Sequence, residues 1–232
     1  MNHNGDTPES LRFERKYVVS EMTREQTEHV LCLHPALFSE IYHQRLVNNI
    51  YFDSPEYKNY FANVDGLQHR VKCRIRWYGD LFGKIDQPVL ELKIKNGLLG
   101  RKESYKLASF ALDRNLSLTT IRDLFDRSEL PAHVRLELKT ISPSLLNRYC
   151  RKYFQSADRR FRITVDSQQE FYRVDYYRNT FLHRSSDHLN LIVELKYDQE
   201  SANLVHDVSS RLPFRMSKNS KYVNGIQRLL MI

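Results

Sequence analysis

Cysteine, glycine and proline are all scarce in this chain of 232 residues, which contains three, seven and seven of them. Cys32, Cys73 and Cys150 are far apart and form no CxxC pair, so neither a zinc site nor a disulfide framework is indicated. No apolar run is long enough to span a bilayer, and the N-terminal sequence lacks the apolar segment of a secretory signal. We therefore expect a cytoplasmic protein without a transmembrane segment.

Several motifs of catalysis are also missing. The nine histidines show no HExxH spacing, and the glycine-containing segment NGLLGRKESYK lacks the GxxxxGK[ST] pattern of a P-loop. What the chain has in excess is positive charge, with a formal net charge of +8 and a pI near 9.3. This charge favours an anionic partner, which can be a nucleic acid, a phosphate compound or a membrane surface.

The most informative pattern is an alternation of charged and apolar residues that recurs in five segments of the chain. In RVKCRIRW, which begins at Arg70, every second residue is basic and the residues between are apolar. Successive side chains of a β-strand point to opposite faces, so such a segment predicts one apolar and one cationic face. The other four segments are RFERKYVV, LELKIK, RFRITVD and LIVELK.

Two structures explain such strands. One is an antiparallel sheet whose outer face is solvated. The other is a closed or nearly closed barrel with a charged interior, which water and an anionic ligand must fill because unpaired buried cations are costly. The recurrence of Arg and Lys with isolated Glu favours a polyanion site with a metal.

The remaining elements predict one α+β domain over residues 11–232, preceded by a disordered segment over residues 1–10. A capping box that starts at Thr23 predicts a helix to about Cys32. Pro55 is expected in the first turn of a short helix, and Pro131 is expected to interrupt a mostly helical region. The other expected elements are strands over residues 42–52, 70–78 and 89–95, a loop over 96–106, helical residues in SANLVHDVSSRL, and a final helical turn or two.

An ordered set of segments resembles the polyphosphate polymerase domain of the vacuolar transporter chaperone (VTC) type, within the wider CYTH or triphosphate tunnel superfamily. They are RFERKYVV, NNIYFDSPEYKNY, RVKCRIRWYG, LELKIK, RYCRKYF, RRFRITVD, IVELKY and FRMSKNSKYVNGI. In the wider superfamily two alternating glutamates usually precede a lysine, and here Arg12 takes the first acidic place. This difference favours the polymerase type over the hydrolase type.

The resemblance implies an antiparallel β-barrel, the triphosphate tunnel, with a basic interior and flanking helices. It implies an ATP:polyphosphate phosphotransferase that transfers the ATP γ-phosphate to a growing polyphosphate chain and needs a divalent metal, Mn²⁺ or Mg²⁺. The residues it implies for catalysis are Lys16, Lys218, Arg74 and Arg76. Those for phosphate binding are Arg12, Lys72, Lys93, Arg151, Arg160, Arg162, Lys196, Ser217 and Lys221, and those for the metal are Glu194, Glu14 and Glu91.

Other functions stay open at this point. A tripolyphosphatase or nucleoside triphosphatase would use water as the acceptor in the same tunnel, and a non-catalytic sensor would only bind polyphosphate. Nucleic acid is not expected as a partner, because Trp77 falls on the face opposite the basic residues and so offers no stacking platform among them. Any membrane partner would be a separate polypeptide.

Overall fold

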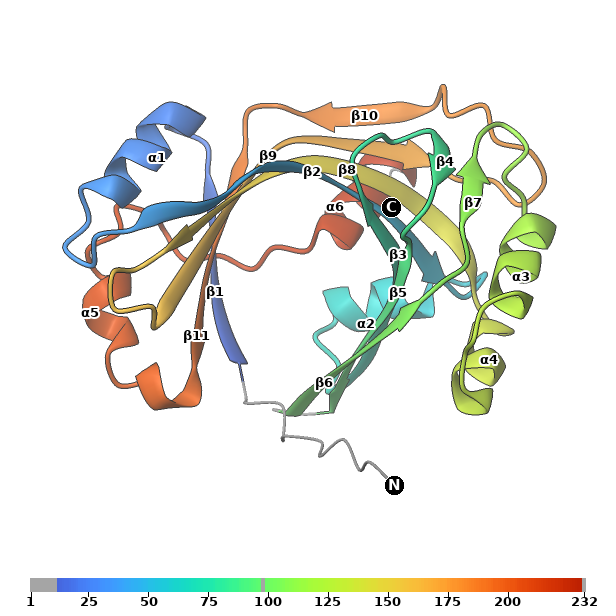
Figure 1. The fold of residues 1–232 in the computed structure, drawn as a ribbon, viewed down its shortest axis with the longest axis horizontal. Helices are drawn as coiled ribbons and strands as arrows, with labels where there is room; N and C mark the ends of the chain where they lie inside the picture. The colour runs from blue at the N-terminus through green and yellow to red at the C-terminus, as the bar shows by residue number, and fades with distance from the viewer. Residues whose placement is uncertain (1–11, 97–98, 231–232) are drawn as a thin grey trace. The chain divides into compact units, whose positions relative to one another are not determined.

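The computed structural model describes residues 12–96 and 99–230 (Figure 1). The predicted disorder of residues 1–10 lies outside the described residues. The strands are β1 (Arg12–Val19), β2 (Ser39–Asp53), β3 (His69–Tyr78), β4 (Gly83–Ile85), β5 (Val89–Asn96), β6 (Leu99–Lys106), β7 (Phe110–Leu112), β8 (Ser142–Gln155), β9 (Phe161–Arg173), β10 (Arg184–Asp187) and β11 (Leu191–Asp198). The helices are α1 (Arg24–Cys32), α2 (Lys58–Val64), α3 (Leu118–Asp126), α4 (Ala132–Leu138), a 3₁₀ turn (Gln199–Ser201), α5 (Val205–Ser209) and α6 (Lys221–Leu230).

The chain divides into two compact units, and strands β2, β8 and β9 pass from one to the other. Unit 1 comprises residues 1–44, 152–167 and 189–219, and unit 2 comprises residues 45–151, 168–188 and 220–232. Over the described residues the main sheet has the strand order β1-β11-β9-β8-β2-β3-β5-β6, with β10 paired to β9. The pairings with a known register are all antiparallel, and the order is an open path. The fold is thus mostly antiparallel sheet with flanking helices, and the closed tunnel stays a prediction.

In unit 1 the apolar face of β1, β9 and β11 is covered by helices. Tyr17, Ile163 and Val193 are buried in one cluster with Leu31 of α1 and Val208 of α5. Figure 1 shows α1 and α5 beside these strands. The alternation of the sequence is the cause, because apolar residues between the charged positions, such as Tyr17, Ile163 and Val193, point to this cluster. The charged positions of the same strands are consequently left on the opposite face of unit 1.

In unit 2 the same arrangement is built from β2, β3 and β5. Cys73, Ile75 and Trp77 of β3 are buried with side chains of α3 and α4, which lie next to β7 in Figure 1. Burial raises the pKa of the Cys73 thiol, so this cysteine behaves as a small core residue, as predicted. Lys72, Arg74 and Arg76 are only partly buried and alternate with this core. The strand prediction for residues 70–78 is therefore confirmed, with β3 starting one residue earlier.

Two helices pack on the other, charged face of unit 2. Helices α2 and α6 lie against each other, and Tyr222 and Ile226 of α6 are buried with Tyr51, Leu145 and Phe171. Gly225 permits this close approach, because a Cβ atom there would lie 2.5 Å from Leu145 Cδ2 and 2.6 Å from Phe171 Cδ1. The final helix is thus a ten-residue element of the core, longer than the expected turn or two.

Several local predictions are confirmed by the structure. Thr23 and Gln26 form the capping box of α1, with Thr23 Oγ1 accepting from the Gln26 amide at 3.2 Å. Pro131 lies between α3 and α4 and directly precedes the first residue of α4, where a proline is tolerated. None of the helices in the described ranges is both long and apolar enough to cross a bilayer.

Two local predictions are wrong, and a third is confirmed only in part. Pro55 lies in a turn that Tyr57 N closes onto Ser54 O at 2.9 Å, and α2 begins only at Lys58. Residues 99–106 form strand β6 rather than a loop, because backbone pairing with β5 outweighs the two glycines; residues 97–98 lie outside the described ranges. The segment SANLVHDVSSRL is helical only over α5, and the preceding 3₁₀ turn reaches only its first residue, Ser201.

Candidate functional site

The charged face of unit 1 carries four interacting side chains, which we call the charged quartet: Glu14 and Lys16 of β1, and Glu194 and Lys196 of β11. The antiparallel register pairs Lys16 with Glu194 and Glu14 with Lys196. Lys16 Nζ lies 3.1 Å from Glu14 Oε1 and 3.2 Å from Glu194 Oε1, and Lys196 Nζ lies 3.1 Å from Glu194 Oε2. The structure therefore brings four predicted site residues into one cluster.

The quartet keeps Lys16 strongly cationic. Burial by itself lowers the pKa of Lys16, but the carboxylates of Glu194 and Glu14 outweigh burial and hold the pKa above its ordinary value of 10.5. The Glu194 side chain is only 7% exposed, and Thr164 Oγ1 lies 3.5 Å from its Oε2. Lys16 is thus a fixed positive charge at neutral pH, positioned by two carboxylates.

The same two carboxylates are the candidate metal ligands of unit 1. Glu14 is on β1 and Glu194 is on the adjacent strand β11. Their Oε1 atoms are directed at the same point, since both contact Lys16 Nζ. Mg²⁺ and related hard cations are usually bound by one or two carboxylates together with substrate phosphates and water. Glu14 and Glu194 fit that donor set. In the described part of the chain no cluster of three or more His, Cys, Asp or Glu side chains is suited to a metal.

The other predicted residues of unit 1 are placed differently. Ser217 holds the backbone of β1, because its amide donates to Lys16 O at 2.8 Å and its Oγ accepts from the Val18 amide at 3.0 Å. Arg162 lies opposite Lys196 in the register and is exposed, as is Lys218. Arg160 precedes β9, and its Nε is 4.0 Å from Asp158 Oδ2. Arg12 pairs with Asp198 through the backbone, and its side chain lies outside the described part.

In unit 2 the charged face is dominated by cations around Glu91, and we call it the cationic face. Its members come from β3, β5, β6, β8 and α6: Lys72, Arg74, Arg76, Glu91, Lys93, Lys102, Arg151 and Lys221. Glu91 Oε2 lies 2.6 Å from Arg74 Nη2 and 3.6 Å from Arg76 Nη1, and Glu91 Oε1 lies 2.8 Å from Lys102 Nζ. Three cations thus converge on one carboxylate.

Tyr149 of β8 joins Arg76 to two further cations on this face, Arg151 and Lys221. Its hydroxyl accepts from Arg76 Nη2 at 3.3 Å. Arg151 Cζ lies 5.2 Å and Lys221 Nζ 4.7 Å from the centroid of its ring, which are cation–π distances. Arg151 and Lys221 are both at least nine-tenths buried. The aromatic ring therefore positions arginine and lysine groups that the low dielectric makes electrostatically strong.

The remaining predicted cations of unit 2 are Lys72 and Lys93, which the register places opposite each other. Lys72 Nζ donates to Ser220 Oγ at 3.1 Å, so β3 is connected to the residue just before α6. Lys93 is exposed and also lies opposite Lys102 of β6. Three lysines thus follow one another across β3, β5 and β6.

Sequence reasoning missed part of the cationic face. Tyr51 of β2 points to the charged face, where Arg74 Nη1 donates to its hydroxyl at 3.4 Å. Asn49, on the same face of β2, accepts from Arg76 Nε at 3.0 Å. The period of two from Phe52, which is in the core, could have placed both residues. Lys102 was assigned to a loop, so only the β5–β6 register reveals its position.

Glu91 makes the stability of the protein depend on pH in the acid range. Burial raises the pKa of Glu91, but Arg74, Arg76 and Lys102 outweigh burial and lower the pKa from 4.5 to about 2. The resulting stabilisation, about 3 kcal/mol, is complete above pH 4.5 and is lost progressively as the pH falls to about 2. Urea unfolding of the wild type and of Glu91→Gln across this range measures it. The difference between their free energies of unfolding should shrink as the pH falls, and a constant difference would contradict the prediction.

Comparisons with known proteins agree with this fold. At a TM-score of 0.51 the chain is similar to a candidate adenylate cyclase of Vibrio parahaemolyticus (10% identity, covering 96% of this chain and 99% of that chain). A protein of Pyrococcus horikoshii (10% identity, 93% and 99%) and a candidate adenylate cyclase of Bacillus halodurans (12% identity, 94% and 97%) have the same score. At such identities the likeness concerns the fold alone.

Comparison with curated proteins finds no match. A family model, the VTC domain, matches residues 11–230 and therefore nearly the whole sequence. The match includes both the charged quartet and the cationic face, and it agrees with the ordered motifs of the sequence. The chain belongs to the VTC domain family.

Proposed function

We propose that this chain is a phosphotransferase that moves the γ-phosphate of ATP to the end of a polyphosphate chain and releases ADP. The observation that carries the proposal is the cationic face of unit 2, where Arg74, Arg76 and Lys102 share the single carboxylate of Glu91. A guanidinium has five N–H donors, so the two arginines retain donors for a polyanion. Membership of the VTC family supports the same substrate class.

The residues divide into two roles. Arg74, Arg76, Arg151 and Lys221 are proposed to bind phosphate oxygens, because they are partly or fully buried and are oriented by Glu91 and Tyr149. Glu91 is proposed to position these arginines rather than to ligate a metal, because three cations already surround it. Lys72, Lys93 and Lys196 are proposed to contact the phosphate chain as point charges, and Arg162 through its guanidinium donors.

The charged quartet of unit 1 is proposed to supply the metal ligands and the lysine of the reaction. Glu194 and Glu14 would hold Mn²⁺ or Mg²⁺, and the bound ion would offset negative charge on the phosphates. Lys16 would contact the transferring phosphoryl group. Negative charge moves onto the leaving oxygen during the transfer, and the fixed positive charge of Lys16 would stabilise it. Ser217 sets the backbone of β1 at Lys16 and would act through this position.

The proposed reaction requires little covalent help from the protein. A terminal oxygen of the acceptor chain attacks the γ-phosphorus, the bond to the β,γ-bridging oxygen breaks, and that oxygen leaves with ADP. Cations must therefore hold donor and acceptor in line and stabilise the charge that develops. Both charged faces consist of groups able to do this.

The test is a ³¹P NMR time course of the purified chain with ATP and Mn²⁺ or Mg²⁺, with and without EDTA. Growth of polyphosphate signals together with ADP supports the proposal. Free phosphate with ADP and no polyphosphate would instead establish a hydrolase. If polyphosphate binds but ATP stays intact, the chain is a sensor and the proposed transfer is wrong.

The cationic face has its own test in the variant Arg76→Ala. Arg76 is only 13% exposed and bonds to Asn49 and Tyr149, so its loss removes an oriented phosphate donor. We expect the rate of ADP formation to fall about tenfold to a hundredfold. Arg122→Ala is the matched control, because Arg122 is exposed on α3. Equal rates in the two variants would exclude Arg76 from phosphate binding.

A further inference from the structure

Unit 2 contains a pocket of about 400 Å³ that belongs to neither charged face. We call it the aromatic pocket, and it is lined by Phe82, Gly83, Leu112, Asp113, Arg114, Tyr172, Thr180, Phe181 and Arg184. Its volume is in the range of sites that hold a small organic ligand. The inference drawn from it is independent of the proposed function.

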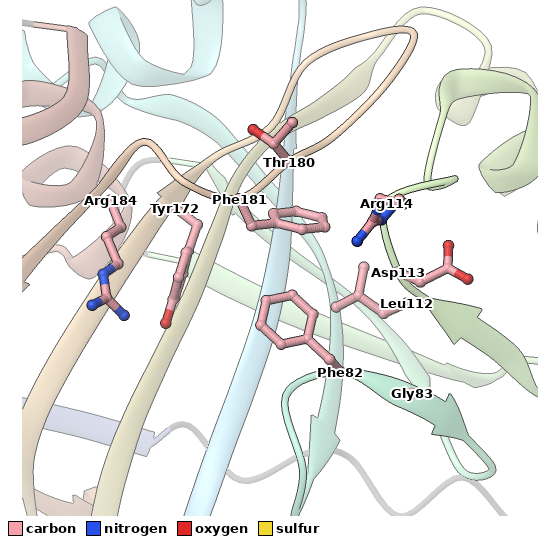
Figure 2. A pocket seen from close by; sticks show the side chains of 9 residues that line it. All are labelled: Phe82, Gly83, Leu112, Asp113, Arg114, Tyr172, Thr180, Phe181 and Arg184. Carbon is pink, nitrogen blue, oxygen red and sulfur yellow. The ribbon is translucent and has the colours of Figure 1, made fainter.

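Three aromatic rings form the centre of the pocket. The ring centroid of Phe82 lies 5.1 Å from that of Phe181 and 6.1 Å from that of Tyr172, with the latter pair edge to face. Figure 2 shows the three rings grouped between Arg184 on one side and Arg114 on the other. Phe82 is 44% exposed, which is unusual for a ring inside such a cluster. An exposed ring backed by two others offers a surface on which a planar group can stack.

The walls of the pocket are held in place by Asn179, which is almost fully buried. Its Nδ2 donates to Leu116 O at 2.8 Å and to Asp175 O at 2.9 Å, and its Oδ1 accepts from the Asp175 amide at 2.8 Å. Its own amide donates to Arg114 O at 3.3 Å. The loop that carries Phe181 is therefore fastened to the segment that carries Arg114.

Phe181 itself has a φ of 55°, a left-handed conformation that bulky L residues rarely adopt. Such conformations persist only where the surrounding structure enforces them, and they are often found at ligand sites. Here the conformation accompanies the packing of the Phe181 ring against Phe82. The pocket is thus organised before any ligand arrives.

The charge in the pocket favours an anion. Arg114 and Arg184 are both exposed, and Arg178 and Arg114 line a smaller adjoining cavity. Over residues 12–96 and 99–230, neither Arg114 nor Arg178 forms an ion pair with a carboxylate. The Asp113 carboxylate accepts from the Asn115 amide at 2.7 Å and is turned away from the rings in Figure 2. Glu170 is held by the Tyr172 hydroxyl at 2.8 Å.

The pocket lies on the face of the sheet opposite the cationic face. Tyr172 and Phe181 pack with the core cluster of Cys73, Ile75 and Trp77, and these residues alternate along β3 with Lys72, Arg74 and Arg76. Phe171, the neighbour of Tyr172 on β9, points instead to the cluster under α6. A ligand in the pocket is therefore separated from the cationic face by the strands themselves.

We propose that the aromatic pocket binds a small ligand that combines a planar ring with a phosphate group, the chemistry of a nucleoside monophosphate. The ring stacks on Phe82, and the phosphate binds Arg114 or Arg184 through charge-assisted hydrogen bonds. Neither the planar ring nor the phosphate alone is expected to bind tightly. The aromatic rings do not recognise charge, and an ion pair with the two arginines is weakened by their exposure to water.

The test uses AMP as the probe and isothermal titration calorimetry of the full chain. Adenosine and ribose 5-phosphate serve as the two halves, and each should bind at least about tenfold more weakly than AMP. Saturating tripolyphosphate occupies phosphate sites on the charged faces, and AMP binding should persist in its presence. Loss of AMP binding on adding tripolyphosphate would overturn the proposal.

Two variants locate the binding. Phe82→Ala and the double variant Arg114→Ala with Arg184→Ala should each weaken AMP binding about tenfold, and the exposed positions of these residues leave the fold intact. Arg122→Ala, an exposed arginine of α3, should bind AMP as the wild type does. Undetectable AMP binding in the wild type, or equal binding in all variants, would overturn the site. Neither result alters the ³¹P NMR test of phosphate transfer.

Discussion

Glu194→Gln should lower the rate of ADP formation from ATP by about a hundredfold or more. The change keeps the shape of the side chain but removes the charge that Lys16 and Lys196 contact at 3.2 Å and 3.1 Å. It removes a proposed metal ligand and releases Lys16 from one of its two positioning carboxylates. Loss of one oriented electrostatic group in an active site typically costs 10²–10³ in rate. Initial rates in ATP and in tripolyphosphate, over a range of Mn²⁺ concentrations, measure the effect.

Glu200→Gln is the matched control, because Glu200 is an exposed glutamate of the same unit. It should react at the wild-type rate. Thermal unfolding must show that Glu194→Gln is folded, since Glu194 is buried. If the folded variant retains wild-type rates with both substrates, the charged quartet is structural and the assignment of Glu194 is wrong.

Asp53→Ala should lower the free energy of unfolding by about 3 kcal/mol. The Asp53 carboxylate is fully buried and accepts from the amides of Ser54, Asn59 and Tyr60 and from the hydroxyl of Tyr222. Asp53 therefore caps the N-terminus of α2 and also holds α6 in place through Tyr222. The alanine removes the cap and leaves a buried hydroxyl without this acceptor. Urea unfolding followed by circular dichroism measures the loss.

Two further variants separate the contributions at Asp53. Tyr222→Phe removes only the hydroxyl and should lower the free energy of unfolding by about 1 kcal/mol. Asp65→Ala changes an exposed aspartate just beyond the end of α2 and should have little effect. A loss for Asp53→Ala no larger than that for Asp65→Ala would show that the buried carboxylate does not hold α2 and α6.

Much of the site could be predicted because the period of a strand is local information. Alternation alone placed Lys72, Arg74 and Arg76 on one face and Cys73, Ile75 and Trp77 on the other, as the structure confirms. The same rule put Glu194 and Lys196 together on β11. The helix boundary at Thr23 was equally local, since a capping box involves residues only three apart.

The features that could not be predicted depend on residues distant in sequence. That Lys16 lies between Glu14 and Glu194 follows from the β1–β11 register, which no local pattern specifies. The convergence of Lys102 on Glu91 depends on the β5–β6 pairing, in a segment where glycines suggested a loop. The prediction that Pro55 lies in the first turn of a helix was wrong because proline is favourable both there and at the second position of a turn.

The non-contiguous composition of unit 1 has a consequence for the synthesis of the protein. A nascent chain emerges N-terminus first, so β1 leaves the ribosome long before its partner β11 has been made. The free edge of an unpaired strand can pair with a strand of another nascent chain, which leads to aggregation. Charged side chains at alternate positions, Glu14 and Lys16 among them, discourage such pairing. The residues proposed to act on phosphate would then also protect the nascent chain from aggregation during its synthesis.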